Sequence, residues 1–287
     1  MAQRLVRAKR RIRDARIPFA VPGRDAVPER LPAVLEAVYG CYALERSGPA
    51  ALAGEARYLA LLLAVLLPEE PETWGLAALV TLASARRRLP GGRFVPLDEQ
   101  DPRDWDADLI AEGQRYLRRG DAERGAAPPG RFQLEAAIQA VHCARAQTRA
   151  TDGPALLTLY RALVRVAPSL GARVALAGVR GQVEGPGAGL AALDEVAPSP
   201  AVTAFQPYWA TRAHLLAATG RADDAVAAFD AAIALTDDDA VRGYLEAQRG
   251  RLRGRGEGTP SGAGAPRARR DRPVDPGQSP SPGGDRT

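Results

Sequence analysis

The stretch that most constrains this chain is residues 206–237, which read as two short amphipathic helices joined by a turn at Gly220. The apolar positions recur at spacings of four and three residues, as Trp209, Ala213 and Leu216 in the first helix and as Ala225, Phe229 and Ala232 in the second. Such spacing places side chains on one face of a helix. A single helical hairpin cannot bury that face, so the chain must supply neighbours that stack against it.

The hairpin resembles a tetratricopeptide (TPR) repeat, a unit of about 34 residues with a similar order of aromatic and small side chains. The positions that carry the resemblance are Trp209, Ala213, Gly220, Ala225, Phe229 and Ala232. Leu216 stands where the repeat usually has a tyrosine, and Asp237 stands where it usually closes with proline. A generic helical hairpin has a similar apolar stripe, so that alternative stays open.

Earlier segments extend the pattern. The four-and-three spacing returns in Leu156, Tyr160 and Leu163. Phe229 follows Tyr160 after roughly two TPR periods of about 34 residues. Leu190 and Leu193 mark a shorter unit between them, and residues 240–252 are expected to cap the stack. These repeats predict TPR-type packing through Leu156, Tyr160 and Leu163 as well as through the hairpin at 206–237.

The composition supports a helical fold. Hydrophobic residues make up 46% of the chain and aromatic residues 5%, and no run of β-branched residues alternates like a half-buried strand. We therefore predict an all-α fold, a helical-hairpin array or α-solenoid of the TPR type. The longest apolar run, residues 58–67, is far shorter than the ~20 residues that span a bilayer. Two cysteines favour a reducing, cytoplasmic location over a disulfide scaffold.

The net charge of +5 is concentrated at the two ends. Residues 1–16 are strongly basic with an apolar stripe, the tail at 253–287 has an excess of arginine, and the body between them is net acidic. A basic helix of this type suits phosphate contacts. From charge alone, a solvated helix explains the first segment at least as well.

Several segments together resemble a group of extracytoplasmic-function (ECF) sigma factors that end in a TPR-containing extension. The resemblance lies in MAQRLVRAKRRIRDARIPFAVP (1–22), VPERLPAVLEAVY (27–39), LLPEEPETWGLAALVTLASARR (66–87), GGRFVPLDEQDPRDWDADLIAEG (91–113), GRFQLEAAIQAVHCA (130–144) and the repeats up to about Leu252. It implies that residues 1–16 are a remnant basic helix of a helix-turn-helix, from the fourth conserved sigma region. It also implies a regulatory role in transcription initiation, with RNA polymerase or other sigma regions as partners.

The chain departs from that family at its start. The polymerase-binding region and the first helices of the −35 reader precede the point that matches Met1, so we expect no initiation by this chain alone. In a helix-turn-helix the N-terminal residues of the second helix reach the base edges. The side chains that remain are expected to make weak, salt-sensitive phosphate contacts: Gln3, Arg4, Arg7, Lys9, Arg10 and Arg11.

The domain organisation follows from these readings. We predict a remnant DNA-binding helix at 1–16, a proline-rich linker at 17–27, a helical extension domain at 28–130, TPR-like repeats at 131–252 and a disordered tail at 253–287. A TPR-like concave face implies a protein or peptide ligand. A free-standing TPR-like adaptor, with no role at promoters, is therefore the alternative function.

No residue set predicts catalysis, a cofactor or a metal site, and we expect the chain not to be an enzyme. Asp104, Asp106 and Asp108 have the spacing of a calcium loop, but Leu109 stands where that loop needs glycine. A capped helix start explains these acids better. Another cluster, Gly91, Gly92 and Arg93, is either a tight turn or a partner contact.

Three local expectations concern packing. Cys41 lies among core-type residues and is expected to be buried. Glu69, Glu70 and Glu72 are expected to complement the positive end of their own helix. Residues 120–130 are expected to form a loop. His142 and Cys143 are adjacent on a predicted helix and point about 100° apart, so they are not expected to share a metal.

Overall fold

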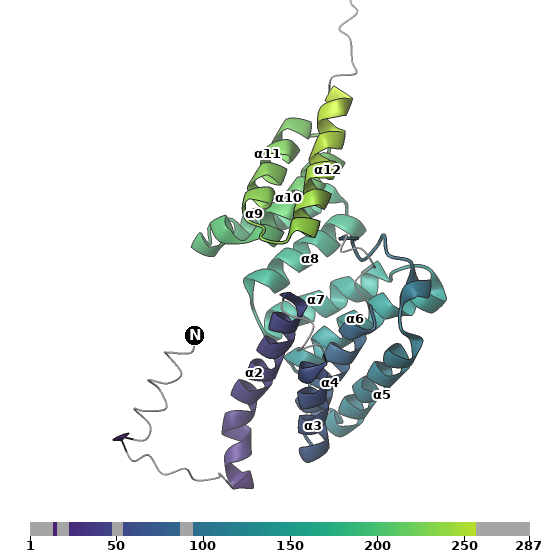
Figure 1. The fold of residues 1–287 in the computed structure, drawn as a ribbon, viewed down its shortest axis with the longest axis vertical. Helices are drawn as coiled ribbons and strands as arrows, with labels where there is room; N and C mark the ends of the chain where they lie inside the picture. The colour runs from purple at the N-terminus through teal and green to yellow at the C-terminus, as the bar shows by residue number, and fades with distance from the viewer. Residues whose placement is uncertain (1–13, 16–22, 48–53, 87–93, 257–287) are drawn as a thin grey trace, which may run out of the picture.

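The structure, a computed structural model, describes residues 14–15, 23–47, 54–86 and 94–256 (Figure 1). In this part of the chain every regular element is a helix, and the α-helices follow one another in a consecutive array. The predicted all-α, solenoid-like fold class is therefore confirmed. The α-helices are α2 (Val27–Ser47), α3 (Glu55–Leu66), α4 (Pro71–Ser84), α5 (Ala107–Arg124), α6 (Arg131–Thr148), α7 (Gly153–Val166), α8 (Leu170–Val183), α9 (Pro186–Val196), α10 (Gln206–Ala218), α11 (Ala222–Ala234) and α12 (Asp239–Gly256).

The helices pack as successive hairpins. The pairs are α2 with α3, α4 with α5, α6 with α7, α8 with α9, and α10 with α11, after which α12 packs on α11. Four helices, α6, α8, α10 and α12, begin at residues 131, 170, 206 and 239, each close to one TPR period of about 34 residues after the last. We call the first helix of each hairpin, together with α12, the first-helix layer.

Caps and prolines fix where the helices begin. Asp106 accepts hydrogen bonds from the backbone N–H groups of Asp108 and Leu109, so the acidic run before α5 is a helix start. In the same way Asp152 caps α7 and Ser169 caps α8. These caps satisfy N–H groups that have no partner within the helix.

One expected loop begins later than the sequence suggested. Helix α5 continues to Arg124, so Gly120 lies inside it, and the expectation of a loop from residue 120 was wrong. The reason is close packing, because a Cβ atom at Gly120 would lie 3.0 Å from the Pro71 carbonyl oxygen and 3.0 Å from the Trp74 Cβ. Glycine here lets α5 approach α4 at the start of the second hairpin.

The core is divided along the array into clusters. One cluster joins α2, α3, α4 and α6 around Leu76 and Phe132, and another joins α10, α11 and α12 around Phe229. Packing between neighbours is what stabilises a repeat array. Within the ranges given above, none of the helices has the length and apolarity needed to cross a bilayer.

Candidate protein-binding surfaces

The predicted TPR packing residues lie inside the stack. Seven of them are buried: Leu156, Leu163, Ala213, Leu216, Ala225, Phe229 and Ala232. Trp209 and Tyr160 are half-buried and pack against these clusters, and Gly220 has a positive φ of 76° at the turn between α10 and α11. These side chains hold the helices together, so a binding surface must be sought elsewhere.

Two of the predicted sites lie outside the residues that the structure describes. They are the DNA-contacting set, Gln3, Arg4, Arg7, Lys9, Arg10 and Arg11, and the partner-contact set, Gly91, Gly92 and Arg93. Both therefore remain predictions. Among the described residues, no group of three or more His, Cys, Asp or Glu side chains is arranged to hold a metal ion.

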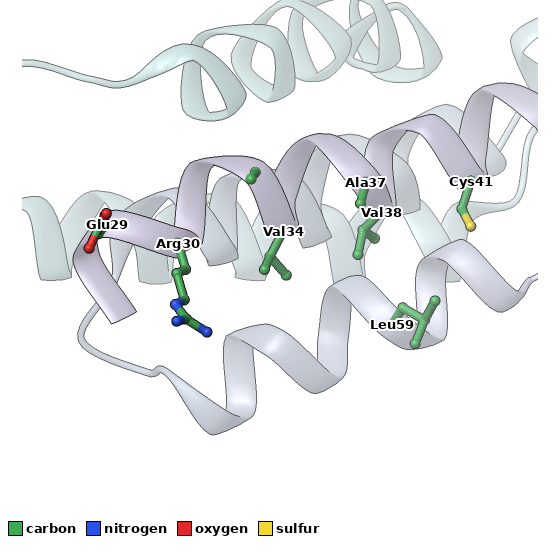
Figure 2. Close-up of a pocket in the computed structure, with 8 residues that line it drawn as sticks. Glu29, Arg30, Val34, Ala37, Val38, Cys41 and Leu59 are labelled. Atoms are coloured by element: carbon green, nitrogen blue, oxygen red, sulfur yellow. The ribbon is translucent and has the colours of Figure 1, made fainter. Parts of the chain in front are cut away.

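An open apolar groove of about 500 Å³ lies between α2 and α3, which form the first hairpin (Figure 2). Val34 and Val38 of α2 face Leu59 of α3 across it, while Glu29 and Arg30 lie at one end. Val34 keeps 40% of its surface exposed. The lining is almost entirely apolar, which suits a nonpolar side chain of a partner.

The outer side of α3 extends this apolar character. Tyr58, Leu62 and Val65 recur at helical spacing and are all exposed, Tyr58 by 63% and Val65 by 60%. Leu44 of α2 is exposed as well. Large exposed apolar side chains gathered on neighbouring helices commonly mark an interaction site.

Cys41 lines the α2–α3 groove and is exposed, so the expectation that it is buried was wrong. The buried stripe of α2 runs through Leu35 and Val38 and continues to the partly buried Tyr42 instead. Cys41 is displaced from that stripe by about 100° of helix rotation. The groove thus contains a free thiol, whereas Cys143 on α6 is buried.

Glu72 has a role that the sequence did not reveal. Its carboxylate accepts hydrogen bonds from the backbone N–H groups of Phe132 and Gln133, each at 3.0 Å, at the start of α6. Burial raises the pKa of Glu72, and the two backbone hydrogen bonds oppose that rise. Glu72 therefore caps a helix in the next hairpin and joins α4 to α6.

A second surface lies where residues 94–101, which we call the strap, cross the first-helix layer. Arg145 of α6 is buried, and its guanidinium donates hydrogen bonds to the carbonyl oxygens of Leu97 and Gln100. The same guanidinium lies 5.2 Å from the centroid of the Trp105 ring. No sequence signal distinguishes Arg145 from the many other arginines of the chain, so only the structure identifies it.

His142 lies on α6 close to Arg145, and its pKa makes the stability of the fold depend on pH. Burial, and then the positive charges of Arg86 and Arg145, lower its pKa to about 4, with Asp98 acting in the opposite direction. Between pH 6.5 and about 4 the unfolded chain therefore binds a proton that the folded chain does not. This contribution to stability is present above pH 6.5 and is lost as the pH falls.

We expect the wild-type protein to lose on the order of 1–2 kcal/mol more free energy of unfolding than His142→Asn between pH 7 and pH 5. Urea unfolding followed by circular dichroism at both pH values measures the difference. His142→Gln serves as a second neutral replacement. Identical pH slopes for all three proteins would show that His142 titrates normally in the folded state.

Comparison with known proteins adds a family match and one relative. Residues 30–121, about a third of the chain, match a family of unknown function (DUF6596), which is associated with sigma-factor-like proteins. An uncharacterized protein of Rhizobium meliloti (strain 1021) is 35% identical over 260 residues, which are 86% of this chain and 60% of that protein. The chain thus spans less than two thirds of the length of this relative. No solved structure matches.

Proposed function

We propose that this chain is the C-terminal regulatory part of an ECF-type sigma factor, and that it acts by binding the sigma regions that contact RNA polymerase. The observation that carries the proposal is the open apolar groove between α2 and α3. The groove lies in the first hairpin, directly after the basic segment that resembles the fourth sigma region. Most of it also falls within the match to a family associated with sigma-factor-like proteins.

The groove suits an amphipathic helix. A partner helix of that kind binds by placing apolar side chains, spaced at about one turn, between two helices of the receptor. Val34 and Leu59 offer the apolar floor, and Glu29 and Arg30 at one end can pair with polar side chains of the amphipathic partner helix. Under this proposal the protein is a cytoplasmic regulator that needs neither a cofactor nor catalysis.

A matched pair of valine substitutions tests the proposal. The ligand is a purified fragment carrying the second and fourth regions of an ECF sigma factor from the group with the same extension. We expect Val34→Glu to weaken its binding at least tenfold, because an unpaired carboxylate would be buried in the interface. Val166→Glu makes the same change at a valine of α7 that is 50% exposed and does not line the groove, and it should bind like wild type.

Isothermal titration calorimetry measures these affinities, and circular dichroism checks that both variants are folded. Labelling of Cys41 by a maleimide gives an independent readout, because a bound partner should slow it while the buried Cys143 stays silent. Purified bacterial core polymerase forms a separate arm of the test. Binding to core polymerase alone would show that the partner is the polymerase and not the sigma regions. Equal binding by both valine variants would show that the groove is not part of the interface.

The second candidate is a free-standing TPR-like adaptor, which the regular spacing of α6, α8, α10 and α12 favours. Under that alternative the partner binds the repeats and is insensitive to Val34→Glu. The DNA-contacting residues of the first segment matter to neither candidate beyond weak phosphate binding, which should fall steeply with salt.

A further inference from the structure

The connection between α4 and α5 is much longer than joining two helices of a hairpin requires. Residues 85–106 lie between these helices, whereas helix–helix connections usually take about 2–8 residues. Part of this connection is the strap. In Figure 1 the segment that follows the grey trace after α4 lies near the lower end of α12 and then runs back toward α5. Helix–helix connections of this length are commonly functional.

One end of the strap is firmly anchored. Arg145 holds the Leu97 and Gln100 carbonyl oxygens, and Leu97 packs into a cluster with Trp105. The Gln100 side chain donates to the Val95 carbonyl oxygen at 3.0 Å and accepts from the Trp105 indole N–H at 3.3 Å. A buried guanidinium that binds main-chain carbonyls recognises backbone rather than a particular side chain.

The other end of the strap rests on an aromatic cluster. The Phe94 ring lies edge-on to Tyr244 of α12, with centroids 5.3 Å apart. Tyr244 is in turn 6.0 Å from His214 of α10, which lies 5.2 Å from Phe229. Phe94 nevertheless remains 39% exposed. Within the described residues, a partly solvated ring contact therefore holds this end.

The acidic residues of the strap lie over the same helices. The negative charges of Asp98 and Glu99 act to raise the pKa values of His214 and Tyr244, although burial of the imidazole lowers the pKa of His214 overall. Both carboxylates are exposed, and Asp98 also acts on His142 of α6. The strap thus places an aromatic ring on α12 and its negative charge close to the imidazoles of α6 and α10.

We propose that the surface of α6, α10 and α12 under the strap is a binding site for an extended acidic peptide of a partner protein. The strap occupies this site in the free protein and competes with the peptide. The strap sequence FVPLDEQD defines the ligand chemistry: an aromatic side chain followed four, five and seven residues later by acids. Tyr244 and His214 receive the aromatic side chain, and Arg145 receives main-chain carbonyl groups.

Because the strap is part of the same chain, it occupies the site in the free protein in preference to a separate peptide. A segment attached by a short connection has an effective concentration on the order of millimolar, so a separate peptide of equal chemistry must displace it. The apparent affinity of that peptide is reduced by the fraction of molecules in which the site is open. Weakening the half-exposed Phe94 contact should therefore raise the affinity for an external ligand.

A fluorescein-labelled, terminally blocked peptide with the sequence of residues 94–101 tests this on the full chain by fluorescence anisotropy. Phe94→Ala should bind the peptide at least tenfold more tightly than wild type. The double variant Phe94→Ala/Tyr244→Ala should lose that gain, because it lacks the receiving ring. Val166→Ala, an exposed apolar residue away from this site, should behave as wild type.

Three outcomes would overturn the proposal: the same affinity for wild type and Phe94→Ala, no binding to any variant, or a double variant that binds like Phe94→Ala. A peptide in which phenylalanine is replaced by alanine and all three acids by amides should bind none of the proteins. Circular dichroism establishes that each variant is folded. Val34→Glu should leave the peptide affinity unchanged, so the result is independent of the proposed sigma contact in the α2–α3 groove.

Discussion

Phe229→Ala is expected to lower the free energy of unfolding by about 3–5 kcal/mol, the usual cost of removing a fully buried aromatic ring. The ring is 1% exposed and lies at the centre of the cluster formed by α10, α11 and α12. Its removal opens a cavity. The neighbouring Ala213 and Ala225 are small, buried and closely packed, so they cannot move in to fill it. Urea unfolding followed by circular dichroism measures the loss.

The matched control is Tyr58→Ala, which truncates an aromatic residue that is 63% exposed on α3. It should change the free energy of unfolding by no more than about 0.5 kcal/mol. Because each hairpin contacts its neighbours, the Phe229→Ala loss should concentrate in α10, α11 and α12. Hydrogen exchange should show faster exchange there and retained protection in α4. Uniform loss of protection would mean that the array unfolds as one cooperative unit.

Glu72→Ala is expected to cost about 2–4 kcal/mol, because it leaves the N–H groups of Phe132 and Gln133 without their acceptor. Glu72→Gln retains one acceptor oxygen, so it should cost about half as much. Glu69→Ala is the control, since Glu69 is exposed and lies just before α4, the helix that carries Glu72. Thermal and urea unfolding compare the three variants. A Glu72→Ala loss no larger than that of Glu69→Ala would rule out the cap.

The pKa shifts of Glu72 and His142 have opposite effects on stability as the pH falls. Burial raises the pKa of Glu72 above its ordinary 4.5, so the folded chain binds this proton more tightly than the unfolded chain. Taken alone, Glu72 therefore stabilises the fold as the pH falls through that range. The acid sensitivity between pH 6.5 and 5 should accordingly come from His142 and from His214, whose pKa burial also lowers.

The helical array could be predicted from the sequence because its signals are local. The four-and-three spacing around Phe229 and Tyr160 depends only on helix geometry, and both residues lie on helices of the expected kind. The same holds for Asp106, whose cap is made with residues two and three positions later.

The features that sequence reasoning missed all depend on contacts between distant parts of the chain. Glu72 accepts hydrogen bonds from residues in the next hairpin. Gly120 lies inside α5 because the close approach of α5 to α4 leaves no room for a side chain there. Cys41 differs from its buried neighbours by a rotation about the helix axis, and the packing of α2 on α3 and α4 decides which of these residues are buried. For the strap, Gly91 and Gly92 predict a tight turn just before it, but the position of Phe94 on α12 depends on how the later hairpins stack.

The Phe94–Tyr244 contact also bears on the mechanics of the molecule. Solenoids flex like springs, since each unit touches the adjacent units and nothing limits the distance between remote ones. Here a segment that leaves the second hairpin reaches the last helix and sets an upper limit on that distance. With the strap seated, the Phe94–Tyr244 contact therefore adds resistance to any movement that separates α12 from the second hairpin.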